Sequence, residues 1–254
     1  MTLQGRFAEL ARSGGRGALV TMLAGSAPGT RMLFSADGAS EGSLGDPQID
    51  AVAGEAADEL MWAERSEQRE VAGATLFVDA VYPAPRLIAF GAIDFAAQLC
   101  TLARTSGWRP YVVDPRARFA TRERFPDAEE VIAGWPQEAF AALGGIDRAT
   151  SIAVLTHDPK LDDAALEIAL RSEASYIGAM GSRRAQAKRR ERLLAKGLTD
   201  DELDRLSAPI GLDLGALTPE ETALSIMGEV VAVRRGREGG RLRHAGGRIH
   251  EVGA

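Results

Sequence analysis

The sequence predicts an α/β protein, in which a domain built on a parallel sheet follows a smaller α+β domain. Two observations predict this fold. Short apolar, β-branched runs alternate with helical patterns from residue 86 onward, and the segment Pro83–Pro85 separates that region from the one before it. Such alternation is typical of parallel strands joined by crossover helices. Because proline restrains its own φ and the residue before it, we expect a stiff linker between domains at residues 1–82 and 86–235.

The composition narrows the classes of function. The chain has 254 residues, of which 45% are hydrophobic, and a formal net charge of −6. This hydrophobic content supports a buried core, whereas the negative charge argues against nucleic-acid binding. A single cysteine, Cys100, excludes an intramolecular disulfide and a cysteine-built metal site. With no signal-peptide pattern and no run of roughly 18 apolar residues, we expect a cytoplasmic protein without a membrane partner.

The first domain has the pattern of a small α+β unit. Apolar runs at Ala18–Leu23, Arg31–Phe34 and Thr75–Val81 predict strands, and helical spacing over Pro47–Arg65 predicts a helix. Glycine-rich turns separate these segments. The composition favours a binding or docking module over a catalytic one.

The second domain alternates strand and helix. Its last helix is marked by Thr218 as N-cap, Pro219 at the first helical position and Glu221 in a capping box. After this helix, glycine and arginine dominate, which predicts a flexible tail over residues 236–254. The predicted strands are Leu87–Phe90, Tyr111–Val113, Glu130–Ile132, Ile152–Leu155 and Ser175–Ile177.

The first strand of the second domain leads into a turn at Gly91. A dinucleotide site needs further glycines at such a turn, because the backbone must approach the pyrophosphate closely. Ile93 stands where the middle glycine belongs, and Asp94 adds negative charge beside the phosphate position. The turn therefore favours a Rossmann-type fold more than it favours binding of NAD(P).

Asp114 ends the second strand, 23 residues after Gly91. That is close to the roughly 20 residues expected before a ribose-binding carboxylate. A carboxylate at a strand end can also cap the next turn, so two interpretations of Asp114 stay open. Arg116 and Arg118 follow it; they could meet a phosphate or be solvated loop residues.

Parallel sheets place ligands beyond the carboxyl ends of their strands, which directs attention to Thr156, His157 and Asp158. An imidazole there could act as a base or a hydrogen-bond donor, since it titrates near neutrality. The alternative is that Asp158 caps the helix beginning near Leu161 while His157 faces solvent. No second histidine is placed to form a metal site.

The loop after the next strand contains Gly178, Gly181, Ser182, Arg183 and Arg184. Flexible backbone, a hydroxyl and two guanidinium groups ahead of a helix suit a phosphate or another anion. The alternative is the basic first turn of a charged helix whose solvated face holds Lys188, Arg189, Arg190 and Arg192.

Four segments stand out as a set: Thr156–Pro159, Tyr176–Arg184, Ala208–Ala216, which contains Asp213, and Thr218–Glu221. Together they resemble the XdhC/CoxI family of maturation factors for molybdenum hydroxylases. The amino-terminal segment resembles the first domain of that family. Two positions depart from the family pattern: Gly91–Ala96 lacks its glycine-rich turn, and Gly45–Pro47 stands where many members carry a cysteine.

The resemblance implies that the chain binds molybdenum cofactor (molybdopterin), protects it during sulfuration by a cysteine desulfurase, and passes it to a molybdenum hydroxylase apo-enzyme. No catalytic residue is then required. The expected cofactor-binding residues are Gly91, Asp114, Thr156, His157, Asp158, Gly178, Gly181, Ser182, Arg183, Arg184 and Asp213. Two alternatives stay open: an NAD(P)-dependent oxidoreductase and a scaffold that binds no ligand. A homodimer is also open.

Overall fold

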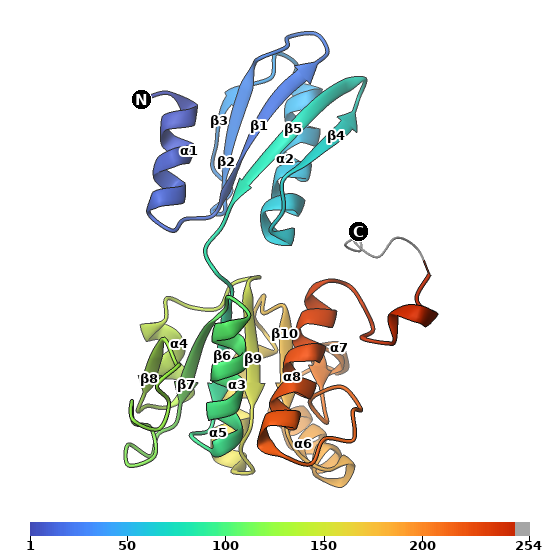
Figure 1. Ribbon diagram of the computed structural model, residues 1–254. Coiled ribbons are helices and arrows are strands. Elements are labelled where there is room, and N and C mark those ends of the chain that lie inside the picture. The colour runs from blue at the N-terminus through green and yellow to red at the C-terminus, as the bar shows by residue number, and fades with distance from the viewer. Residues whose placement is uncertain (247–254) are drawn as a thin grey trace. The chain divides into compact units, whose positions relative to one another are not determined.

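The computed structural model describes residues 1–246. The chain forms two compact units, Met1–Pro83 and Ala84–Ala254, and each unit has its own sheet (Figure 1). The predicted tail begins at residue 236, and its described part includes a 3-10 turn at Leu242–His244. Its part beyond residue 246 lies outside the described residues, so flexibility of the tail stays a prediction. No helix in the described part of the chain is long and apolar enough to cross a membrane.

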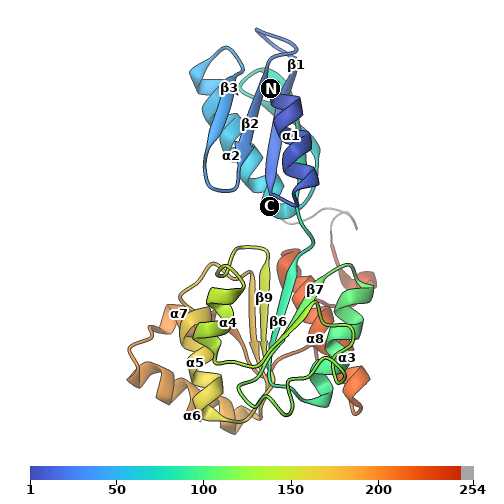
Figure 2. The same cartoon turned by 90° about the vertical axis from the view of Figure 1, so that its left-hand side faces the viewer.

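The first unit is an antiparallel sheet with the strand order β3-β2-β1-β5-β4. The helices α1 and α2 lie on opposite faces of it (Figure 2). Alanines and leucines of α2, such as Ala53 and Leu60, pack against Val20 and Leu76 of the sheet to form the core. The elements are α1 (Leu3–Arg12), β1 (Gly17–Ala24), β2 (Arg31–Ser35), β3 (Ser40–Ser43), α2 (Pro47–Ala63), β4 (Glu67–Val71) and β5 (Ala74–Val81).

The second unit is a parallel sheet with the order β11-β10-β9-β6-β7-β8. Numbered from β6, this is the order 6-5-4-1-2-3, which confirms the Rossmann-type sheet that the sequence predicts. The order reverses between β6 and β9, and ligands bind at that point in such sheets. The strands are β6 (Arg86–Phe90), β7 (Arg109–Val113), β8 (Glu130–Ile132), β9 (Thr150–Val154), β10 (Tyr176–Ala179) and β11 (Leu206–Ser207).

Helices cover both faces of the parallel sheet (Figure 2). Alternate residues of β6 point to the two faces: Ile88 and Phe90 join one buried cluster, Leu87 and Ala89 the other. A strand buried on both sides has an unbroken apolar sequence, which explains why these strands are easily recognised. One face carries α3 (Asp94–Thr105) and α8 (Pro219–Arg234); the other carries α4 (Pro136–Ala142), α5 (Pro159–Ala169) and α6 (Arg183–Ala195), with α7 (Asp200–Asp204) following.

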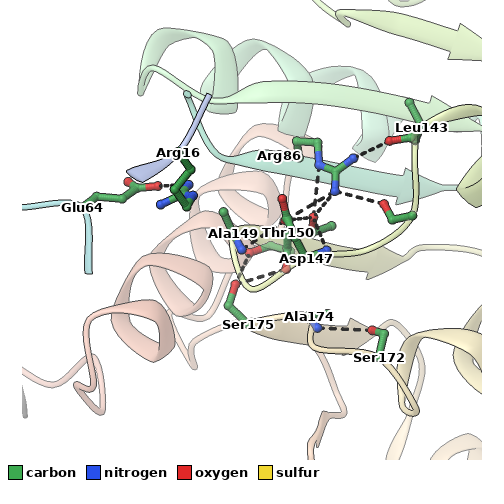
Figure 3. Close-up of polar contacts among 12 residues, drawn as sticks. Arg16, Glu64, Arg86, Leu143, Asp147, Ala149, Thr150, Ser172, Ala174 and Ser175 are labelled. Carbon is green, nitrogen blue, oxygen red and sulfur yellow. Dashed lines mark hydrogen bonds and ion pairs between the residues drawn. The ribbon is translucent and has the colours of Figure 1, made fainter. Parts of the chain in front are cut away.

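Arg86 fixes the amino-terminal edge of the parallel sheet (Figure 3). Its guanidinium donates to the carbonyl oxygens of Leu143 at 2.7 Å and Gly145 at 3.0 Å, and to Thr150 Oγ1 at 2.8 Å. The Thr150 hydroxyl in turn donates to Asp147 Oδ1 at 2.6 Å. These bonds join the start of β6 to the loop that leads into β9. The two strands that flank the reversal of order are therefore held together at the edge opposite their carboxyl ends.

Candidate functional site

A cavity of about 520 Å³ opens at the carboxyl ends of the parallel strands. Its walls come from the residues that follow β6, β7, β9 and β10, so it lies where the strand order reverses. The volume is within the range of about 300–1,000 Å³ that is usual for small-molecule sites. The lining residues are Ile93, Asp94, Phe95, Arg116, Leu155, Thr156, His157, Asp158 and Met180.

Gly91 lets the turn after β6 lie directly against the loop after β9. Its φ is +115°, and a Cβ at this position would lie 2.4 Å from Thr156 Cγ2. Its N–H donates to the carbonyl of Val113 at 2.8 Å. Ile93 then serves as N-cap of α3 without a side-chain capping bond, and its side chain lines the cavity. The isoleucine thus occupies the wall where a dinucleotide-binding turn would have glycine.

Asp114 is fully buried, and its carboxylate is satisfied within the chain. Oδ2 accepts from the N–H of Ala92 at 2.9 Å and from Arg116 Nη2 at 2.7 Å. Oδ1 accepts from the N–H and the Nε of Arg116, both at 2.9 Å. A carboxylate has about four acceptor positions, so these four donors leave none for a ribose hydroxyl. Asp114 holds the glycine turn and the loop after β7.

The ionisation of Asp114 follows from these bonds. Burial raises the pKa of the carboxyl, but the hydrogen bonds from the Arg116 side chain and from two backbone N–H groups outweigh it, so the pKa lies below its usual value. Asp114 is therefore a fixed anion paired with Arg116, whose side chain remains half exposed on the wall of the cavity.

A buried network joins the loops that follow β9 and β10. The hydroxyl of Thr156 donates to Asp162 Oδ1. Arg189 Nη2 donates to Asp162 Oδ2 at 2.9 Å and to the carbonyl of Met180 at 3.1 Å. Burial raises the pKa of Asp162 even though the bonds from Thr156 and Arg189 lower it. The network fixes Thr156 and Met180, two residues that both line the cavity.

The alternative interpretation, in which Arg189 belongs to a solvated face of α6, is wrong for this residue. Its side chain is 4% exposed and pairs with Asp162, which is 2% exposed. Arg192 forms two bonds of 2.8 Å to Asp163, and Arg190 pairs with two carboxylates of α7. The sequence held a signal that Asp162 and Asp163 are buried and need partners, because they fall on the same buried part of α5 as Leu161, Ala165 and Leu166, but it did not identify the partners.

The sequence left two interpretations of His157 and Asp158 open, a helix cap and a ligand site, and the structure has features of both. Asp158 is the N-cap of α5, and its side chain accepts from the N–H of Lys160 at 3.0 Å. Both residues also line the cavity, and His157 is exposed there. The imidazole is therefore available to a ligand, while Asp158 has one oxygen committed to the helix.

The glycine-rich loop after β10 is built for packing. Gly178 is buried in β10, where a Cβ would lie 2.4 Å from the hydroxyl of Tyr176. Gly181 has a φ of +136°, and Ser182 caps α6 by accepting from the N–H of Ala185. Arg183, Arg184 and Asp213 are exposed, and the residues that line the cavity do not include them. Met180 is the residue of this loop that lines the cavity, and sequence reasoning did not single it out.

Cys100 is buried in α3, as its apolar neighbours indicate. Burial, with a smaller contribution from Asp127, raises the pKa of the thiol to about 12. We expect this thiol to react with an aromatic disulfide reagent only after denaturation, because the nucleophile is the thiolate. Fast labelling of the native protein would contradict this expectation. Absorbance of the released thiolate measures the rate.

The comparisons with known proteins agree with this architecture. Residues 87–230 match the XdhC Rossmann domain, and residues 10–75 match the XdhC and CoxI family. The chain belongs to the XdhC family. This confirms the resemblance that the motifs indicate. No group of three or more His, Cys, Asp or Glu side chains that could hold a metal ion occurs within residues 1–246.

Several XdhC relatives carry informative names. The chain is 30% identical over 160 residues to a probable xanthine dehydrogenase subunit of Bacillus subtilis, matching 63% of this chain and 46% of that protein. It is 27% identical over 156 residues to the molybdenum cofactor insertion chaperone PaoD of Escherichia coli, matching 61% and 42%. A crystal structure described as a xanthine dehydrogenase from Bacillus halodurans is 26% identical, with a TM-score of 0.62 over 92% of this chain and 66% of the other. The matches span less than half of the two curated relatives.

Proposed function

We propose that this XdhC-family chain binds molybdenum cofactor in the cavity at the carboxyl edge of its parallel sheet and delivers it to the apo form of a molybdenum hydroxylase. The observation that carries this proposal is the cavity itself, which lies at the reversal of strand order and has the Arg116 guanidinium and the His157 imidazole on its wall. The relative named as a cofactor insertion chaperone supports the same role.

The walls of the cavity fit the organic part of this cofactor. Ile93, Phe95, Leu155 and Met180 provide apolar surface for a flat pterin ring. His157 provides a polar group that can bind its edge. In this proposal the molybdenum is carried as cargo on the pterin. The chain needs only to bind, shield and release it.

The same geometry weighs against the NAD(P)-dependent oxidoreductase. A nicotinamide dinucleotide needs a free carboxylate at the end of the second strand and glycine in the first turn. The four acceptor positions of Asp114 are taken by Ala92 and Arg116, and Ile93 stands in the turn. We expect no measurable binding of NADH.

Titration of the purified protein with molybdopterin and, separately, with NADH tests the proposal. We expect tight binding of the pterin alone. Changing His157→Ala should weaken it about two- to tenfold, the usual effect of one lost hydrogen bond. Arg183→Ala is the matched control and should leave the affinity unchanged. Binding of NADH alone would support the oxidoreductase, and binding of neither would support a scaffold.

Sulfuration by a cysteine desulfurase is part of the same proposal. The one thiol of this chain, Cys100, is buried, and Pro47, the first residue of α2, stands where many family members carry a cysteine. A relay of sulfur through a thiol of this chain is therefore not part of the proposal. Loss of hydroxylase activity in cells lacking this protein, with normal levels of the hydroxylase, would support delivery.

Whether the chain forms a homodimer is a separate question, and sedimentation velocity of the purified protein tests it.

A further inference from the structure

A second, smaller cavity of about 230 Å³ adjoins the first. The two cavities share Ile93, Asp94 and Arg116 as lining residues. The smaller one is completed by Ala92, Phe119 and Arg124. Arg116 therefore stands at the junction, and a ligand in the larger cavity could extend past it.

Arginine side chains surround the ring of Phe119 in the smaller cavity. The guanidinium carbons of Arg118 and Arg116 lie 4.5 Å and 4.9 Å from the ring centroid, and that of Arg124 lies 5.7 Å from it. Arg124 also donates to the carbonyl of Ala92 at 2.9 Å and contacts Asp94 at 3.3 Å. The carboxylates that face these guanidinium groups are those of Asp94 and Asp114, together with that of Asp158 on the wall of the larger cavity.

Arg116 is held in a fixed position, but its guanidinium group can still bind a further anion. Its Nε and Nη2 bind the buried carboxylate of Asp114, while the side chain as a whole is half exposed and Nη1 is not used in these bonds. A guanidinium fixed in this way loses little side-chain entropy when it binds a further anion. Asp114 is a positioning residue in this arrangement.

The amino terminus of α3 faces the same cavity. Ile93 and Asp94, the N-cap and first residue of this helix, line both cavities, and the N-cap residue supplies no side-chain capping bond. The first-turn N–H groups and the helix dipole favour an anion at that place. The side chain of Asp94 is 87% exposed, so its charge is largely screened by solvent.

We propose that the smaller cavity is a phosphate subsite, in which Arg116 and the amino terminus of α3 bind the phosphate ester of the ligand whose ring system occupies the larger cavity. The inference rests on the proposed function and deepens it. It places the phosphate at Arg116 instead of at Arg183 and Arg184, which lie outside the walls of both cavities.

A pair of ligands that differ only in the phosphate tests the subsite. Dihydroneopterin and dihydroneopterin monophosphate share the pterin ring, and the fluorescence of the ring reports binding. We expect the wild-type protein to bind the phosphate ester about ten- to a hundredfold more tightly, as expected for charge-assisted hydrogen bonds. Arg116→Gln should abolish this preference while keeping the affinity for dihydroneopterin. Arg183→Gln should keep both affinities.

A substitute variant and an NMR titration test the phosphate subsite independently of Arg116→Gln. If Arg116→Gln does not fold, Arg124→Gln, at the other arginine that lines the smaller cavity, replaces it and should reduce the preference by a smaller factor. In isotope-labelled wild-type protein, inorganic phosphate should shift the Nε–H resonance of Arg116 and leave that of Arg183 in place. Equal affinity of the wild type for the two pterins, or a preference retained in Arg116→Gln, would overturn the subsite. Failure to bind either pterin, with the phosphate shift intact, would overturn the proposed cofactor and keep the subsite.

Discussion

Replacing Arg189 by methionine should lower the free energy of unfolding by about 3–5 kcal/mol, the usual cost of breaking a buried ion pair from one side. Methionine keeps much of the length of the side chain but removes both the bond to Asp162 and the bond to the carbonyl of Met180. The carboxylate of Asp162 would then remain buried with the Thr156 hydroxyl as its surviving partner. Urea denaturation followed by circular dichroism measures the loss.

The controls for this variant come from the same helix and the same pair. Arg183→Met, at an exposed position of α6, should change the stability by less than about 0.5 kcal/mol. Adding Asp162→Leu to Arg189→Met should recover part of the loss, because the uncompensated charge is gone. A loss below about 1 kcal/mol in the single variant would show that water reaches the pair.

The pH dependence of Arg189→Met has a definite sign. Burial raises the pKa of Asp162 above its unfolded value, and removing the cation raises it further. Such a group stabilises the fold in its protonated form, and this contribution is lost as the pH rises through the folded-state pKa. The deficit of the variant should therefore shrink as the pH falls toward and below that pKa. A deficit that is constant with pH would contradict this assignment.

Gly91→Ala should destabilise the protein by about 2–6 kcal/mol, the sum of a strained backbone and an overpacked contact. The φ of +115° disfavours any L side chain, and the new methyl group would meet Thr156 Cγ2 at 2.4 Å. Thr156 cannot move freely because its hydroxyl binds Asp162. The change should also weaken molybdopterin binding, since Thr156 lines the larger cavity and would have to shift. Denaturation and pterin titration measure the two effects.

Gly107→Ala separates the two causes. Gly107 has a φ of +81°, and no other described atom lies within 4 Å of the position of its added Cβ. It should therefore show the backbone strain alone, about 1–3 kcal/mol. An equal loss in both variants would mean that the contact with Thr156 relaxes at no cost.

The parts of the fold that the sequence predicts are those in which burial imposes a pattern. The central strands of the second unit are apolar on both faces, and the capped helices have side chains whose bonding role is local, such as Thr218 with Glu221. The elements that sequence reasoning missed bury little. β3 is exposed throughout, β4 alternates exposed and partly buried residues, and α1 has no fully buried residue in the described structure. The two strands form the edges of their sheet, where charge is favoured.

The location of the candidate site was predictable from the sequence, but the identity of all its lining residues was not. The rule that ligands bind beyond the carboxyl ends of parallel strands leads to Thr156–Asp158, which line the cavity. It cannot say that Met180 faces inward while Arg183 and Arg184 point to solvent, since that depends on where Ser182 starts α6. Nor can periodicity pair Asp162 with Arg189, because each lies on a different helix and only the packing of α5 on α6 joins them.

The bond between Asp114 and Arg116 also bears on how this fold changes ligands over evolution. In a dinucleotide-binding relative of the same topology, the strand-end carboxylate is the group that recognises the ribose. Here that carboxylate is locked inside the wall, so a glycine restored at position 93 would open space without restoring recognition. Arg116 would have to be lost as well, and each change alone would bring no gain. Binding of a dinucleotide by this fold would therefore require substitutions at both Ile93 and Arg116.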